Sequence, residues 1–245
     1  MRYWFDTEET IPAGCGFAHF GREHLLWLLV LAVFIALSCI LYRKLTPHKR
    51  KLMRYVYAAL ILADELFKIT MLLMGDRFLP RYLPFHLCSI NIFLILIHAL
   101  RPSKGLDNFL YTACIPGALA ALLFPIWAVL PPVGNFMTLH SFTIHALLIA
   151  YPLMQFTGGD LRPSYREIGR CVLILLGLAV PALCANLLFG TNFMFLMQAE
   201  PGTPLVWFAE HWGSHLPGFP VLIGAVLLVM HGPLYLLQRK KQKIA

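Results

Sequence analysis

Long apolar stretches alternate with short polar connections along the whole chain. Seven apolar stretches cover residues 24–42, 55–74, 83–100, 106–130, 136–156, 168–189 and 219–238. Each is long enough to cross about 30 Å of hydrocarbon as an α-helix, and only helices or closed barrels satisfy their backbone hydrogen bonds in lipid. The pattern therefore predicts an all-α, polytopic membrane bundle of seven transmembrane helices, forming a single domain over residues 1–245.

Basic residues predict how this bundle is oriented. Fifteen Lys and Arg residues fall in the tail and in the connections after the first, third and fifth stretches, against four on the other side. Because cytoplasmic loops carry the excess of Lys and Arg, the C-terminus is predicted in the cytoplasm and the N-terminus outside. An odd number of spans fits this arrangement.

Composition agrees with a membrane protein. Only 13% of the residues are charged, against about 25% in soluble domains, and the mean hydropathy is +0.70. The net charge of +8 lies in short loops and a tail, so it predicts contacts with anionic lipids and no nucleic acid. We expect a multi-pass protein of a bacterial cytoplasmic membrane whose partners are membrane lipids; the sequence leaves the oligomeric state open.

Ionisable residues inside the second stretch need partners, because each costs roughly 2.5–3.5 kcal/mol in the bilayer. Asp64 and Lys68 are four residues apart, and Glu65 and Lys68 are three apart. Either spacing places the pair on one helix face. Two interpretations remain open: a self-neutralising ion pair in the bundle interior, or a proton relay or headgroup contact.

The segment LPFHLCSINIFL carries four polar side chains in six residues. Pro84 predicts a helix start, which places His86 in the first turn at the outer side. His86 and Cys88 are about 200° apart on a helix, so they cannot form an ordinary Cys-His pair. A histidine below the interface suits acid–base chemistry, whereas Cys88 and Asn91 are equally compatible with packing.

Further polar groups predict a pocket that opens outward. His140 and His145 lie near the outer end of the fifth stretch, about 140° apart, so at most one should face a given site squarely. Asn192 follows the sixth stretch, and His231 lies near mid-depth in the seventh. A hydrogen bond between helices is the alternative for any single histidine. The aromatic segment 190–218, which has no Lys or Arg, is expected partly in the membrane interface.

Metal and cofactor motifs are missing from the sequence. There is no HExxH, CxxC, Walker, GxGxxG or GxSxG pattern, so no metal and no cofactor is predicted. Five of the six cysteines lie in apolar stretches, which excludes a secreted disulfide framework.

Two motifs resemble a known family. LPFHLCSI (83–90) and GTNFMFLMQAEPGTP (190–204) resemble the LPxHLC and N-[YF]-MFL motifs of the bacterial YwaF family of integral membrane proteins. Its animal relatives are similar to membrane acyltransferases acting on phospholipids, with a cysteine beside the motif histidine. The resemblance implies a role for His86, but Phe85 stands where that cysteine is expected.

Three functions follow as hypotheses. The first is an intramembrane acyltransferase or hydrolase with His86 as general base, His140 or His145 as acid or orienter, and Asn91 or Asn192 as oxyanion donor. In the second, a small-solute transporter or binding protein uses Asp64, Glu65, Lys68 and the histidines as a polar path. In the third, the polar groups only lock helices together.

Overall fold

The structure is a computed structural model that describes residues 3–12, 14–126 and 130–244, with the backbone alone for 237–244. The described residues form helices and loops and contain no strand. The long helices are α1 (Arg22–Lys44), α2 (Pro47–Met74), α3 (Leu87–Leu100), α6 (Phe136–Gly158), α7 (Ile168–Phe189) and α9 (Gly218–Ile244). The shorter elements are η1 (Pro80–Tyr82), α4 (Lys104–Phe109), η2 (Leu110–Cys114), α5 (Ile115–Leu123), η3 (Tyr165–Glu167), η4 (Phe193–Phe195) and α8 (Pro204–Trp212).

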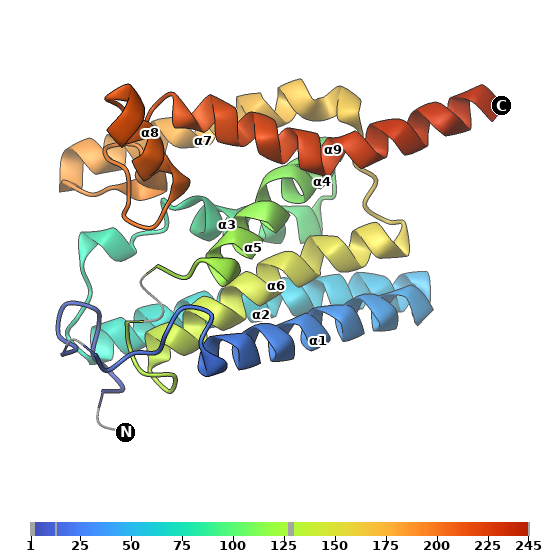
Figure 1. Cartoon of the computed structure of the whole chain (residues 1–245). Helices are drawn as coiled ribbons and strands as arrows, with labels where there is room; N and C mark the ends of the chain where they lie inside the picture. The colour runs from blue at the N-terminus through green and yellow to red at the C-terminus, as the bar shows by residue number, and fades with distance from the viewer. Residues whose placement is uncertain (1–2, 13, 127–129, 245) are drawn as a thin grey trace.

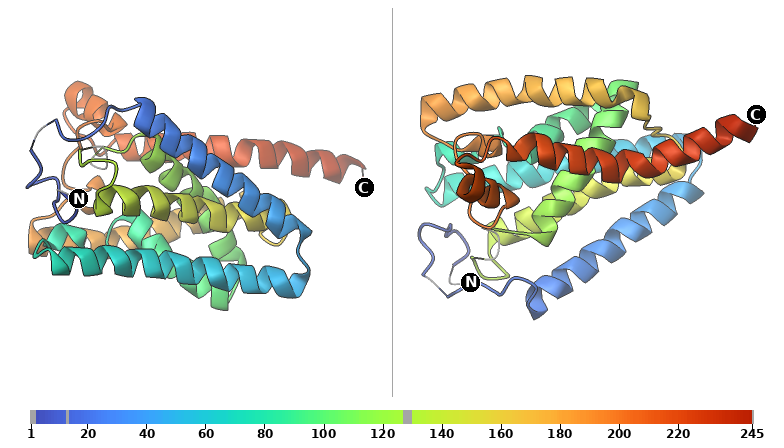
Figure 2. Two further views of the ribbon diagram at one scale, coloured as in Figure 1. Left: turned by 90° about the horizontal axis from the view of Figure 1, so that it is seen from below. Right: turned by 45° about the horizontal axis from the view of Figure 1, so that its top comes forward.

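These helices form two outer layers with a middle layer between them. Figure 1 shows α1, α2 and α6 side by side along one face, α7 and α9 along the opposite face, and α3, α4 and α5 between; Figure 2 shows the same order from two other sides. The core surrounds α6, which is buried along most of its length. Residues 3–21 and α8 lie at one end of the bundle, and α9 runs toward the other end (Figure 1).

Five helical segments in the described part of the chain are long and apolar enough to cross a membrane. They are Arg22–Lys44, Lys104–Leu123, Phe136–Gly158, Tyr165–Phe189 and Gly218–Leu236. Each coincides with a predicted span, and the all-helical prediction is confirmed. The other two predicted spans also form helices, but neither is among these five segments. Helix α3 has 14 residues and rises only about 21 Å, and α2 carries too many charged residues for a membrane-spanning segment by composition. The count of seven and the orientation of the termini remain predictions.

Two predicted helix boundaries were wrong. The third helix begins at Leu87 and not at Pro84, so His86 is its N-cap residue, with extended backbone, instead of lying in the first turn. The fourth span ends at Leu123, before Pro125, whereas 106–130 was predicted; its residues 127–129 lie outside the described residues.

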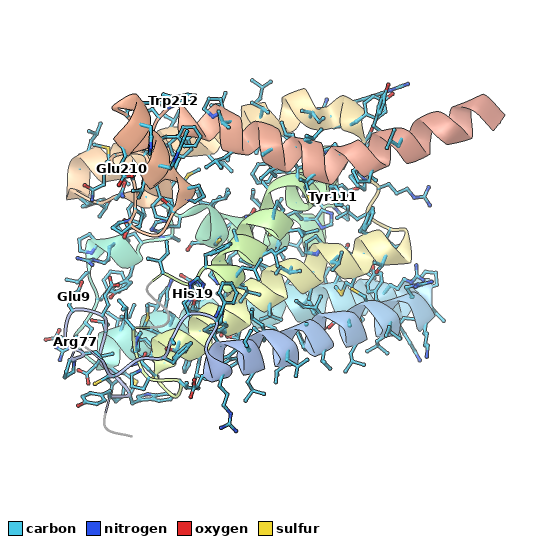
Figure 3. All side chains as sticks on the ribbon, in the orientation of Figure 1. Glu9, His19, Arg77, Tyr111, Glu210 and Trp212 are labelled. Carbon is cyan, nitrogen blue, oxygen red and sulfur yellow. The ribbon has the colours of Figure 1, made fainter. Side chains whose placement is uncertain are left out.

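The fourth span is also interrupted by a π-turn. Residues Leu110–Cys114 form this turn two residues before Pro116, which has no N–H to donate to the carbonyl of Thr112 and whose ring clashes with it. The turn directs the Tyr111 hydroxyl toward α9, where it donates to Met230 O at 2.9 Å (Figure 3). The π-turn therefore joins the middle layer to α9.

Candidate functional site

A large cavity separates the middle layer and α6 from α7 and α9. Its volume is about 1810 Å³, above the roughly 300–1,000 Å³ of most small-ligand pockets. Part of its wall is apolar and comes from α5, α7 and α9; it includes Ala120, Ala121, Leu175, Ala179, Leu222 and Ile223. Leu176, which also lines the cavity, is 58% exposed, so the wall along α7 borders the outer surface of the bundle.

One end of the cavity is closed by α8 and by the N-terminal segment. Arg81 holds the N-terminal segment through Glu8 at 3.1 Å and Glu9 at 2.8 Å. Burial raises the pKa of Tyr82, in the same wall, to about 12, so its phenol stays protonated. Figure 3 shows Glu9 at one edge of this end and Glu210 of α8 across from it.

A buried ion pair lies in the α2 wall at this end. Lys68 Nζ donates to Glu65 Oε1 at 2.6 Å, and both side chains are less than one-tenth exposed. Of the two predicted pairings of Lys68, the one with Glu65, three residues away, is therefore formed. Both residues line the cavity. Asp64 points to α6 instead, where Thr143 Oγ1 donates to its Oδ1 at 2.9 Å.

His140 on α6 joins the two carboxylates of α2. Its Nδ1 lies 3.0 Å from Asp64 Oδ2, out of line for a hydrogen bond, and its Nε2 lies 3.8 Å from Glu65 Oε2. The contact is therefore electrostatic. It places an imidazole between the buried carboxylate of Glu65 and the half-buried carboxylate of Asp64.

His145 has one ring nitrogen fixed by its own helix. Its Nδ1 lies 2.6 Å from Ser141 O, and a carbonyl can only accept, so Nδ1 carries the proton. In the neutral ring Nε2 then holds the lone pair, and the ring lines the cavity. Both His140 and His145 line the cavity, about 140° apart on α6, so the cavity borders two faces of this helix.

His86 has the opposite arrangement. The Met194 backbone N–H donates to His86 Nδ1 at 3.4 Å, so a neutral ring carries its proton on Nε2. The ring also packs against Phe193 and Phe195, with centroids 5.2 and 5.9 Å away. The two sequence motifs, more than 100 residues apart, therefore meet at this histidine.

The 190–198 segment is shaped by two asparagines. Asn186 accepts the Phe193 N–H at 2.6 Å and donates to Phe193 O at 3.1 Å. Asn192 accepts from Met197 N and Gln198 N, and its amide donates to Gln198 O. These bonds hold Met194 and Phe195 at φ +56° and +58°, a conformation that costs non-glycine residues energy. The polar atoms of Asn192 are thus used within the loop.

The remaining predicted residues divide between the cavity and the core. Cys88 lines the cavity. Asn91 is buried outside it, with Oδ1 lacking a hydrogen-bond partner. His231 is also outside it and shares a hydrogen bond with Thr112 Oγ1 at 2.8 Å. Phe85 packs on Phe193, with ring centroids 5.4 Å apart, so it supplies no reactive atom. No group of three or more potential metal ligands occurs among the described residues.

Sequence reasoning missed three residues of this site. Ser141 fixes the tautomer of His145, Thr143 binds Asp64, and Asn186 holds the motif segment. Asn186 and Thr143 had a signal, because a polar side chain inside an apolar stretch requires a partner. Ser141 had none, since it acts through its backbone carbonyl.

Comparison with known proteins places the chain in a family. A family model described as the TMEM164 family matches residues 19–235. The chain therefore belongs to the TMEM164 family, and with its long apolar helices it is a multi-pass membrane protein. No curated protein and no solved structure matches.

Proposed function

We propose that this member of the TMEM164 family is an intramembrane enzyme that transfers or hydrolyses a lipid acyl group. One observation carries the proposal: an apolar cavity of about 1810 Å³ has His86, His140 and His145 at one end, beside the Glu65–Lys68 pair. The apolar wall suits acyl chains, and the polar end suits an ester and its headgroup. The predicted membrane orientation places this end in the outer half of the bilayer.

The hydrogen bonds support distinct roles for two histidines. His145 Nε2, which holds the lone pair, takes the proton from water or from a lipid hydroxyl as that oxygen attacks the ester carbonyl. The His86 Nε2–H donates to the oxyanion that forms. The intermediate expels the alkoxide, which takes the proton back from His145. This assignment reverses the predicted role of His86 as base.

Cys88 is the alternative nucleophile, since it lines the same cavity. A covalent acyl-enzyme would need it, because Phe85 occupies the position of the cysteine expected from the animal relatives. Cys88→Ala separates the two routes. Retained turnover supports direct attack by water or a hydroxyl, and lost turnover in a folded variant supports the thioester.

Untargeted lipid mass spectrometry tests the proposal on membranes that contain wild type, His86→Ala, His145→Ala or His211→Ala at matched protein levels. His211 is the control, because it lies on α8 and its Nδ1 bonds only to Trp207 O among the described residues. We expect a change in acyl composition with wild type and His211→Ala alone. An unchanged lipid profile with wild type, or full activity of both cavity variants, refutes the mechanism.

A transporter is the second candidate, favoured by the buried Glu65–Lys68 pair in the cavity wall. Uptake into proteoliposomes that wild type supports and Lys68→Met abolishes, without any change in lipid composition, would favour it over the enzyme.

A further inference from the structure

A second polar pocket lies at the other end of the bundle. Its volume is about 200 Å³, and its lining includes Arg54, His98, Ser103, Lys104, Asp107 and Asp160. These residues come from the start of α2, the α3–α4 connection and the end of α6. Along α2, Arg54 is 14 residues from Lys68, about 21 Å, so the pocket is separate from the cavity.

The first carboxylate of this pocket is already bonded. Asp107 Oδ1 lies 2.7 Å from His98 Nε2, and His98 Nδ1 lies 2.9 Å from the Tyr151 hydroxyl. His98 is 1% exposed and Tyr151 is fully buried. Asp107 is therefore fixed from the core side, by a chain of hydrogen bonds.

The second carboxylate is bonded as well. Tyr42 Oη donates to Asp160 Oδ2 at 2.7 Å, and Arg50 Nη1 lies 3.4 Å from Asp160 Oδ1. Arg50 also donates to Gly158 O at 2.9 Å, which fixes its guanidinium at the pocket edge. Asp160 therefore has no need of a further cation.

Arg54 has no such partner. Its Nε is shielded from solvent without a hydrogen-bond acceptor, and no carboxylate of the described residues lies within ion-pair distance of it. The lining cations Arg54 and Lys104 balance the lining carboxylates Asp107 and Asp160, and Arg50, which contacts Asp160 from outside the lining, adds one positive charge. The terminal nitrogens of Arg54 also form no hydrogen bond with the described residues, so a ligand that supplies oxygen atoms to them is favoured.

We propose that this pocket binds the phosphate group of a phosphorylated ligand. The planar guanidinium of Arg54 matches two phosphate oxygens, and Lys104 adds a point charge. Ser103 Oγ accepts from Leu106 N at 3.3 Å and keeps its own proton to donate. The volume equals about seven waters at roughly 30 Å³ each, which fits a phosphate and its hydration but no acyl chain.

The phosphate can come from an anionic lipid headgroup or from a soluble phosphate ester. Two measurements on the purified full-length protein separate these sources. Calorimetric titration with inorganic phosphate, at constant ionic strength, tests the soluble form. Native mass spectrometry with phosphatidylglycerol, and with phosphatidylcholine as reference, tests the lipid. The matched variants are Arg54→Gln and Lys49→Gln, which remove one charge each from the same helix; Lys49 is exposed.

At least one of the two ligands should bind wild type and Lys49→Gln alike and bind Arg54→Gln at least tenfold more weakly. If only the binding of inorganic phosphate depends on Arg54, the ligand is a soluble phosphate ester. If only the binding of phosphatidylglycerol depends on Arg54, the ligand is a lipid headgroup. Should Arg54→Gln fail to fold, Lys104→Gln, at an exposed position, must weaken binding several-fold. Equal binding by wild type and the pocket variant, or no binding to wild type, overturns the proposal.

Discussion

Replacing Lys68 by methionine removes the positive half of the ion pair that α2 buries in the cavity wall. The side chains are similar in length, so the main change is the loss of a charge. Glu65, which is 4% exposed, then loses its partner at 2.6 Å. The free energy of unfolding should fall.

The structure sets the size of this loss. At 2.6 Å and an effective dielectric constant of about 20, the pair attracts by roughly 6 kcal/mol. Desolvation offsets part of this, and removing one member of a buried pair typically costs about 3–5 kcal/mol. His140 Nε2, at 3.8 Å from Glu65 Oε2, supplies partial compensation. We therefore expect a loss of about 3 kcal/mol.

Unfolding in detergent, followed by circular dichroism, measures the effect. The double variant Glu65→Gln with Lys68→Met should recover at least half of the loss, because no uncompensated charge remains. Lys49→Met, at an exposed position of the same helix, is the control and should change stability by less than about 0.5 kcal/mol. A single variant as stable as wild type, or a double variant no more stable than the single, refutes the reasoning.

Three other changes test the fold. Asn186→Leu should lower the free energy of unfolding by about 2–3 kcal/mol in the same assay, since it removes two hydrogen bonds to Phe193 and one to Thr191. An unchanged free energy of unfolding would contradict a contribution of these bonds to stability. Gly218→Ala places a Cβ 2.7 Å from Phe208 Cδ2, so α8 should shift. We expect an altered tryptophan emission and a free energy of unfolding that is lower by about 1–3 kcal/mol, whereas unchanged emission would argue against this contact. If the N-terminus lies outside, a membrane-impermeant maleimide should label Cys15 in intact cells and leave Cys15→Ser unlabelled; labelling only after lysis reverses the orientation.

The helices could be predicted from the sequence because a run of about 20 apolar residues has few alternatives to a membrane helix. Their ends were harder to place. Pro84 is a good helix-start residue, but the backbone stays extended through His86, whose Nδ1 bonds to Met194. That bond joins residues 108 apart in sequence, and no local pattern contains it.

The candidate site was predicted only in part, because local sequence patterns do not contain the contacts between distant residues. Glu65 and Lys68 share a helix, so helical geometry indicated their pairing as one of two candidates, the other being Asp64 with Lys68. His231 and Asn91 are polar residues in apolar stretches like the cavity histidines, but His231 bonds to Thr112 and Asn91 is buried outside the cavity. Helix rotation within a bundle depends on packing between elements, which single-helix periodicity does not specify.

The ion pair of α2 also has a consequence for biosynthesis. Asp64 and Glu65 meet Thr143 and His140 of α6, which leave the ribosome about 75–80 residues later. At roughly 5–20 residues per second, α2 waits several seconds for these partners. During that time its carboxylates have no polar contact from α6, and by composition α2 is a weaker membrane helix than its neighbours. If α2 spans the bilayer as predicted, its stable insertion is therefore coupled to the arrival of α6.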